Sequence, residues 1–440
     1  MPFEIDRQTI RDLDIFTGDG GSKTIIDYFD STVTPGGKKY LYNLMNNPVT
    51  DIQAIKKRTE AIQFFRNENT AVNLIPRQFY YIEYYLKLTR SVLHPNVLDA
   101  WYNKISYFIK PDNDYYLIKT GIENLIDLFV SLAKYITASA KQNPPEYIKS
   151  QLDYIQRFLD IPELKPIFSR KPVKVSAFRL NWLDHRFRKK YAEQVKKIIE
   201  ILYAFDVFLA LGNTSRINNL CIPEFVAVST PVLRVENLFH PLVKNAVSYN
   251  VKIDQSANLC FLTGPNMAGK STFLKSIGIS VYLAHLGFPV PASKMQLTLF
   301  NGLITTINLT DNLNKGYSHF YSEVKRVKET ALSLKEKSNL VVIFDELFRG
   351  TNVKDAYDAS LFIITAFARA RTSCFFISTH ITEIADELKN IQNVQYKYLD
   401  STLVDNRPVF NYKIFDGISH ERLGMQIVKN EGIEEILNSI

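Results

Sequence analysis

The stretch GPNMAGKST at residues 264–272 constrains this chain more than any other segment. It follows the apolar run Leu259–Thr263 and leads into a segment with the character of a helix. Its two glycines and its Lys-Ser pair match the pattern G-x-x-x-x-G-K-[ST]. In that pattern the backbone N–H groups of the loop and of the helix start point at an anion. The stretch therefore predicts a phosphate-binding loop between a buried strand and a helix. The alternative is a glycine-containing turn that meets the pattern by chance.

The residues of this loop have different expected roles. Lys270 supplies a positive charge for phosphate, and Ser271 supplies a hydroxyl ligand for Mg²⁺. The other loop residues expected to contact ATP are Gly264, Pro265, Asn266, Met267, Ala268, Gly269 and Thr272.

Two further apolar runs end in residues that suit phosphate chemistry. Residues 340–344 form a run of strand length followed by Asp345 and Glu346, and the run Cys374–Ser378 is followed closely by His380. Ligands of open α/β sheets bind at the carboxyl ends of parallel strands, so these side chains are expected at one edge. We predict that Asp345 holds Mg²⁺, that Glu346 orients the attacking water, and that His380 senses the γ-phosphate.

The order and spacing of four segments resemble the MutS family of DNA mismatch-repair ATPases. These segments are residues 264–272, 311–323, 345–352 and 378–383. The Pro-Asn-Met sequence inside the loop is a much more specific signature than the general pattern of phosphate-binding loops. The resemblance implies a domain related to the ABC ATPases, two copies of which pair head to tail.

That resemblance also implies roles for single residues. Ser318 would reach across the dimer to the γ-phosphate on the other subunit, and Asn266 would contact nucleotide and position water. The chain departs modestly from the family pattern, with His319 and Tyr321 where Thr and Met are usual and Ala268 where Gly is usual.

The N-terminal half resembles the helical core and lever of the same family at residues 12–16, 30–38 and 201–209. The expected fold is therefore a helical core/lever domain at residues 1–232 followed by an ABC-type P-loop α/β domain at residues 233–440. Apolar periodicity predicts helices over the following ranges: 51–65, 76–92, 115–139, 145–159 and 186–211. We expect the mismatch-reading and connector domains to be missing, the clamp to be absent or very short, and no helix-turn-helix after the ATPase.

Two apolar segments near the C-terminus, residues 394–400 and 409–415, predict a hairpin. The resemblance places the residue that stacks on adenine near Tyr412, although hairpin registers can slip.

Charge suggests a polyanionic partner. The net charge is +8 with a pI of about 9.0, and residues 165–197 hold eleven Lys and Arg against two acids. Aromatic residues are interleaved with them, as suits phosphate contact and base stacking. The nucleic-acid contacts predicted here are Arg186, Arg188, Lys189 and Lys190. The alternative is a solvated helix face whose apolar stripe packs inward.

Other features of the sequence narrow the setting. Three cysteines lie at no metal-binding spacing, and the sequence shows neither a signal peptide nor a membrane span, so we expect a cytoplasmic protein without membrane contact.

Taken together, these observations predict a Mg²⁺-dependent ATPase that couples ATP-driven closure of a homodimer, or of a heterodimer with another MutS-like subunit, to duplex, mismatched or branched DNA. Two alternatives stay open: an ATP-gated adaptor for a protein partner, and a relative that acts on ribosomes or RNA.

Overall fold

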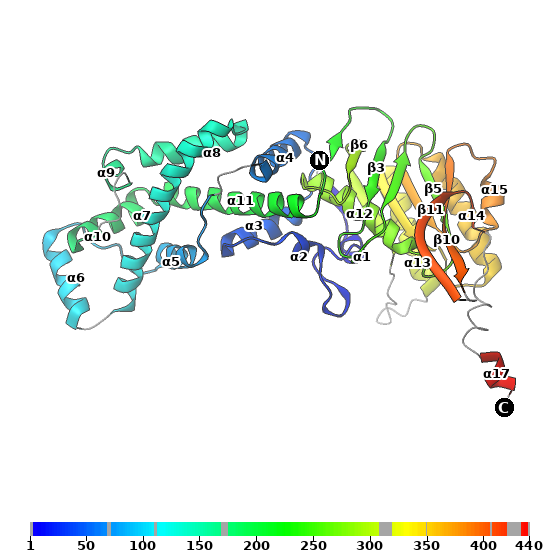
Figure 1. The fold of residues 1–440 in the computed structure, drawn as a ribbon, viewed down its shortest axis with the longest axis horizontal. Helices are drawn as coiled ribbons and strands as arrows, with labels where there is room; N and C mark the ends of the chain where they lie inside the picture. The colour runs from blue at the N-terminus through cyan, green and yellow to red at the C-terminus, as the bar shows by residue number, and fades with distance from the viewer. Residues whose placement is uncertain are drawn as a thin grey trace. The chain divides into compact units, whose positions relative to one another are not determined.

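The computed structural model describes residues 3–67, 72–109, 112–168, 175–307, 319–348, 350–404, 407–419 and 433–438. The chain divides into two compact units (Figure 1). An α/β unit comprises residues 1–28, 47–56 and 218–440, and a helical unit comprises residues 29–46 and 57–217.

The α/β unit is built on a seven-stranded sheet with the order β1-β7-β8-β9-β5-β10-β11. Neighbouring strands are parallel except for the β10–β11 hairpin. The strands are β1 (Glu4–Ile5), β5 (Leu259–Thr263), β7 (Gly302–Thr306), β8 (Leu340–Asp345), β9 (Cys374–Ser378), β10 (Val394–Val404) and β11 (Arg407–Asp416). The hairpin thus follows the predicted segments, with longer strands than expected.

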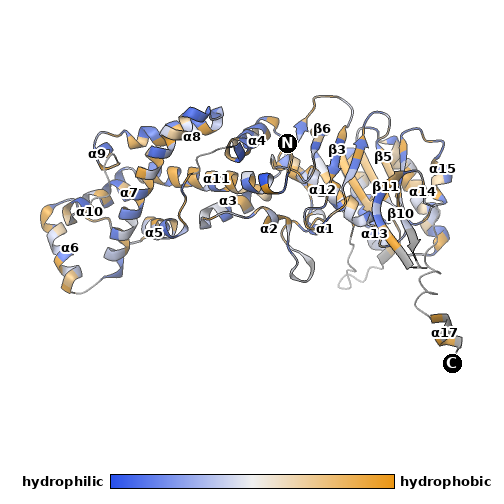
Figure 2. Cartoon of the chain, in the orientation of Figure 1, coloured by the Kyte–Doolittle hydropathy of each residue, from blue (hydrophilic) through white to orange (hydrophobic). Residues whose placement is uncertain are grey.

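The central strands explain why this sheet is parallel and covered on both faces. Every residue of β5, β8 and β9 is buried, with no alternation of polar and apolar positions. Such continuous apolar runs are typical of parallel strands with helices on both faces. Hydropathy colouring shows the hydrophobic character of the central strands (Figure 2).

The helices of the α/β unit are α1 (Arg7–Asp12), α12 (Lys270–Leu286), α13 (His319–Glu336), α14 (Val353–Arg369), α15 (Ile384–Leu388) and α17 (Ile433–Asn438). The short helices η1 (Asp19–Gly21) and α2 (Ile25–Phe29) also lie near the N-terminus. A second sheet has the order β2-β6-β3-β4. Its strands are β2 (Glu224–Phe225), β3 (Leu233–Leu238), β4 (Tyr249–Ile253) and β6 (Lys294–Leu297).

The division between the units differs from the predicted single boundary after residue 232. The helical unit ends at Ile217, and the long C-terminal part of the α/β unit begins at Asn218. Residues 1–28 and 47–56 also belong to the α/β unit. One reason is that Glu4 and Ile5 pair with Gly302 and Leu303 as an added parallel edge strand. A two-residue strand has no sequence period from which it could be predicted.

The helical unit contains most of the helices that periodicity predicted. They are α3 (Pro35–Met45), α4 (Ile52–Asn67, shared with the α/β unit), α5 (Pro76–Lys87), α6 (Val97–Ile109), α7 (Asn113–Ser139), η2 (Ala140–Gln142), α8 (Glu146–Leu159), α9 (Lys165–Phe168), α10 (Ala177–His185), η3 (Arg186–Lys190) and α11 (Ala192–Ile217). The predicted helix over 186–211 is instead a π-helical turn, η3, followed by α11. Helix α6 had not been predicted.

Candidate nucleotide site

Three parallel strands bring the predicted residues to one edge of the sheet. Strand β9 lies between β5 and β8, and Ser378 is in register with Leu262 on one side and Asp345 on the other. The loop after β5 and the acidic pair at the end of β8 are therefore neighbours in space, although about eighty residues separate them in sequence.

Two glycines allow the loop between β5 and α12 to close tightly. Gly264 has φ 142° and Gly269 has φ 101°, values that side chains disfavour. A Cβ on Gly264 would lie 2.7 Å from the carbonyl oxygen of Leu399, and one on Gly269 would lie 3.2 Å from the ring of Tyr412. Ala268 is fully buried, Met267 is exposed, and α12 begins at Lys270.

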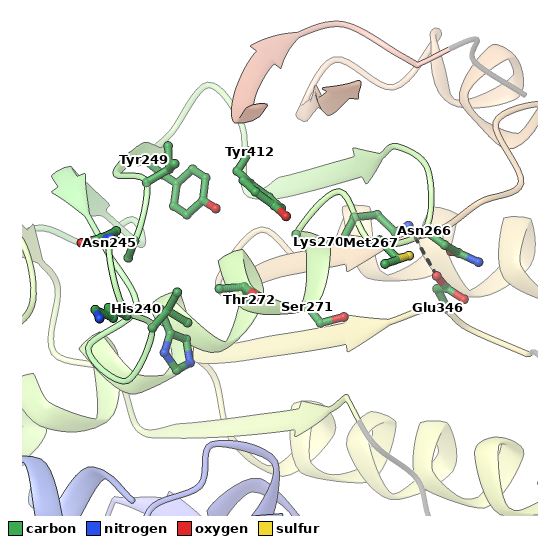
Figure 3. Close-up of a pocket in the computed structure, with 15 residues that line it drawn as sticks. His240, Asn245, Tyr249, Asn266, Met267, Lys270, Ser271, Thr272, Glu346 and Tyr412 are labelled. Carbon is green, nitrogen blue, oxygen red and sulfur yellow. Dashed lines mark ion pairs between the residues drawn. The ribbon is translucent and has the colours of Figure 1, made fainter. Parts of the chain in front are cut away.

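The Lys270 side chain is buried at the centre of the loop. Its Nζ donates to the carbonyl oxygens of Gly264 at 2.8 Å and Pro265 at 3.2 Å. It also lies 3.6 Å from Oε1 of Glu346 (Figure 3). The other carboxylate oxygen of Glu346 lies 3.6 Å from Nδ1 of His380, whose side chain is exposed. The Lys270 cation, the carboxylate predicted to orient water and the predicted γ-phosphate sensor are thus brought together.

A serine that the sequence analysis did not single out connects the two acids. Ser378 is fully buried, and its hydroxyl donates to Oδ1 of Asp345, while the Ser271 hydroxyl donates to Oδ2. The backbone N–H of Glu346 donates to the carbonyl oxygen of Ser378 at 3.1 Å and to its hydroxyl at 3.2 Å. Because Glu346 has φ 59°, these bonds hold a backbone conformation that costs energy. The β8–β9 register could have pointed to Ser378, but a register cannot be obtained from sequence alone.

A cavity of about 680 Å³ opens beside the loop. Its walls include Asn266, Met267 and residues 269–272 of the loop, together with Glu346 and Tyr412. The sequence analysis missed the opposite wall, which is formed by His240, residues 243–247 and Tyr249 (Figure 3). Residues 240–247 lie between β3 and β4, with Asn245 at φ 55°, and Tyr249 is the first residue of β4.

His240 is kept neutral in this wall. Burial, followed by the charge of Lys275, lowers the pKa of its imidazole to about 4. Its Nδ1 accepts a hydrogen bond from the backbone N–H of Leu242 at 3.3 Å. The histidine therefore shapes the cavity wall as an uncharged ring near neutral pH.

The donor set at the loop fits a Mg²⁺ ion. Magnesium prefers oxygen ligands and is often held by one or two protein groups beside phosphate. The Ser271 hydroxyl and the Asp345 carboxylate are already in contact with each other, so both can turn toward one ion. Ser318, the residue predicted to act on the partner's nucleotide, lies outside the described residues.

Three of the four predicted nucleic-acid contacts form ion pairs within the helical unit. The Arg188 side chain is 6% exposed and forms an ion pair with the fully buried Asp184 at 2.7 Å. Arg186 and Lys190 both pair with Glu163, at 3.1 Å and 2.6 Å. Of the four, only Lys189 is exposed without an ion pair among the described residues.

The aromatic residues of this segment divide between the core and the surface. Phe168 and Phe187 are buried in the core of the helical unit. Phe178 is 45% exposed, as are the side chains of several basic residues of the segment: Lys165, Lys189, Lys190, Lys196 and Lys197. The inward-packed alternative therefore accounts for Arg188 and the two buried rings, and contact of the remaining residues with nucleic acid stays a prediction.

The fold and the site define a mixed α/β protein in which a helical unit accompanies a largely parallel sheet with a glycine-bearing loop at its edge. Family models then identify the chain more narrowly. The model described as MutS domain III matches residues 8–212, and the model described as MutS domain V matches residues 260–439. The chain belongs to the MutS family.

Individual relatives give the same result. The DNA mismatch repair protein MutS of Thermotoga sp. (strain RQ2) is 25% identical over 516 aligned positions, which cover 98% of this chain and 64% of that protein. The protein of the same name from Lactobacillus acidophilus is 28% identical and covers 72% of this chain but 38% of its own length. The chain thus spans less than two thirds of these relatives. In the described part of the chain, no helix has the length and apolar character needed to cross a membrane.

Proposed function

We propose that this chain binds ATP in the cavity beside the loop, hydrolyses it with Mg²⁺, and couples the nucleotide state to DNA as a member of a MutS-like dimer. The observation that carries this proposal is the convergence of Lys270, Asp345 and Glu346 at one sheet edge beside a cavity of about 680 Å³. The relatives named for DNA mismatch repair support the DNA part.

Each residue has a defined task in this proposal. Lys270 is already desolvated and directed into the loop, so its charge is preorganised for a phosphate oxygen. Ser271 and Asp345 would hold Mg²⁺, which when bound neutralises phosphate charge. Glu346 would orient water, with His380 and Asn266 near the terminal phosphate and Tyr412 on the cavity wall.

Steady-state ATPase measurements test the proposal. The Glu346→Gln variant keeps the shape of the side chain but loses its basicity, so we expect ATP binding to persist and turnover to fall at least about 100-fold. Glu383→Gln makes the same chemical change at an exposed position outside the cavity and serves as the matched control. Lys270→Ala is the inactive reference. Normal turnover in Glu346→Gln would reject the assigned role.

The DNA part is tested by measuring the same rate with duplex, mismatched, four-way-junction and single-stranded DNA, and with structured RNA. Selective stimulation or inhibition by one DNA form would support it. An ATPase rate that no nucleic acid changes would favour the protein-adaptor alternative. Co-sedimentation of the chain with ribosomes would favour the RNA-acting alternative. Lys189→Ala should reduce the slope of the logarithm of the DNA-binding constant against the logarithm of salt concentration. The reduction should correspond to at most about one phosphate contact.

The dimer part is tested by sedimentation with ATP in the Glu346→Gln background. Ser318 is proposed to complete the site of the other subunit, so Ser318→Ala should lower turnover without lowering ATP affinity to the same degree.

A further inference from the structure

Residues 6–14, called the N-terminal bracket below, contact the helix that follows the nucleotide loop. The Lys275 side chain of α12 donates to Oδ2 of Asp14 at 2.7 Å, and both side chains are partly buried. Leu13 is fully buried, and its side chain would lie 2.8 Å from a Cβ placed on Gly278 of α12. Helix α12 begins with the lysine of the nucleotide loop, so the bracket packs against the helix that carries this lysine.

The bracket also holds the end of strand β7. The Thr9 hydroxyl accepts a hydrogen bond from the Thr305 N–H at 2.9 Å. The Asp12 carboxylate accepts hydrogen bonds from the Thr305 hydroxyl at 2.7 Å and from the Ile307 N–H at 3.0 Å. Because Thr9, Asp12 and Thr305 are buried, removal of one partner would leave a polar group unsatisfied and away from water.

One guanidinium ties helix α13 to the same point. Arg326 of α13 donates to the carbonyl oxygen of Thr305 at 2.7 Å and to the Thr306 hydroxyl at 3.2 Å. It also forms an ion pair with Asp6. The other carboxylate oxygen of Asp6 accepts from the Thr9 N–H at 2.7 Å, at the start of α1. The bracket therefore connects three elements, namely α12, the end of β7, and α13.

These three elements belong to two different nucleotide sites in the proposed dimer. Helix α12 carries Lys270 and Ser271 for the chain's own nucleotide. Between Ile307 and the start of α13 the sequence holds Ser318, which is proposed to act on the nucleotide of the other subunit. The bracket therefore sets where the chain leaves β7 and enters α13 on either side of this serine.

Resting on the proposed function, we propose that Asp12 is a positioning residue for the nucleotide site of the other subunit rather than for that of its own chain. Among the described residues, the lining of the cavity beside the loop includes none from the bracket. Asp12 instead fixes the exit of β7 at Thr305 and Ile307 through directional, charge-assisted hydrogen bonds. A displacement of about 1 Å at a group that contacts the reacting phosphate can lower the rate by about 100-fold.

The test uses heterodimers with one working nucleotide site. Lys270→Ala chains lack the loop cation but keep Ser318, whereas Ser318→Ala chains keep the loop but lack the serine, so mixing them should restore ATP turnover through a single composite site. Asp12→Ala in the Lys270→Ala chain, which supplies the serine, should lower the restored kcat at least about 10-fold and leave KM for ATP within about twofold. The same change in the Ser318→Ala chain, which holds the ATP, should alter kcat by no more than about twofold.

Three observations distinguish positioning from a loss of folding. Turnover that persists with Asp12→Ala in the ATP-holding chain shows that this chain folds. Arg326→Lys keeps the positive charge but cannot form all the hydrogen bonds of the guanidinium, and it should reproduce the same asymmetry more weakly. Glu4→Gln removes a more exposed ion pair with Lys337, beyond the far end of α13, and should change neither arrangement.

The outcomes separate this inference from the proposed function. If the mixture of Lys270→Ala and Ser318→Ala chains restores no turnover, the composite site is refuted and the role of Asp12 is refuted with it. If turnover is restored but Asp12→Ala and Arg326→Lys lower it equally in either chain, or in neither, the composite site stands and only the role of Asp12 is overturned.

Discussion

Replacement of Asp184 by alanine should be among the most destabilising single changes in the helical unit. Its carboxylate is fully buried and accepts hydrogen bonds from the Tyr85 hydroxyl at 2.9 Å, the Leu93 backbone N–H at 2.8 Å, and two nitrogens of Arg188 at 2.7 Å. The Arg188 guanidinium also donates to the carbonyl oxygen of Arg90 at 2.8 Å. The Tyr85 and Leu93 donors and two of the Arg188 nitrogens thus share one carboxylate as their acceptor.

The magnitude follows from what the substitution leaves behind. An uncompensated buried charge such as that of Arg188 costs about 3–5 kcal/mol, and an unsatisfied buried donor such as the Leu93 N–H adds about 1–3 kcal/mol. Because the site can relax, we expect a loss of about 4 kcal/mol. The double change Asp184→Leu and Arg188→Leu should cost clearly less than the sum of the single changes, since neither charge is then left unpaired.

Urea unfolding followed by tryptophan fluorescence measures the stability of the helical unit, which contains Asp184. The chain has two tryptophans, Trp101 and Trp182, and both belong to the helical unit. With a slope of about 2 kcal/mol per molar urea, 4 kcal/mol moves the midpoint down by about 2 M. Glu163→Ala is the matched control, because it removes ion pairs of a partly exposed carboxylate and should cost about 1 kcal/mol or less. A shift below about 0.5 M for Asp184→Ala, or additivity in the double variant, would refute the reasoning.

Three further outcomes can be checked directly. Ser378→Ala removes a hydrogen bond to Asp345 and should raise the Mg²⁺ concentration needed for half-maximal ATPase activity severalfold, while a purely structural role would leave that concentration unchanged. Tyr412→Ala should weaken ATP binding about tenfold by opening the cavity wall, as measured by titration calorimetry. Burial lowers the pKa of both His285 and His240 to about 4, so the unfolded chain binds more protons than the native one below pH 6.5. Thermal stability should therefore fall as pH drops from about 6.5 to about 4, and His285→Gln should reduce that slope.

Much of the candidate nucleotide site could be located from the sequence because its signals are local. The glycines and the Lys-Ser pair lie within one loop, and Asp345 and His380 follow apolar runs whose carboxyl ends must meet in a parallel sheet. Ser378 and His240 could not be found in this way. Their roles depend on the β8–β9 register and on the second sheet, neither of which leaves a periodic trace in the sequence.

Arg188 shows that a count of charges can include a side chain that is not at the surface. A count of charges from 165 to 197 includes Arg188, although Asp184 lies one helical turn before it and pairs with it. The i, i+4 spacing was visible in the sequence, but the burial that makes the pair structural was not. The aromatic residues of α6 differ from Arg188 in the opposite direction. Dense aromatic residues usually belong to a core, yet Trp101, Tyr102 and Phe108 are exposed.

The N-terminal segment has a role that its resemblance to the helical core does not suggest. The Asp12 carboxylate accepts hydrogen bonds from the Thr305 hydroxyl at 2.7 Å and from the Ile307 N–H at 3.0 Å. Arg326 of α13 donates to the carbonyl oxygen of Thr305 at 2.7 Å and pairs with Asp6. These contacts hold the chain on both sides of residues 308–318, which include the predicted signature serine. Asp12 and Arg326 are buried charged groups that form directional hydrogen bonds. They therefore set the orientation of the chain at Thr305 and Ile307 as well as its position. The N-terminal residues Asp6 and Asp12 therefore belong to the α/β unit, and the boundary between the helical and α/β units is not a single position in the sequence.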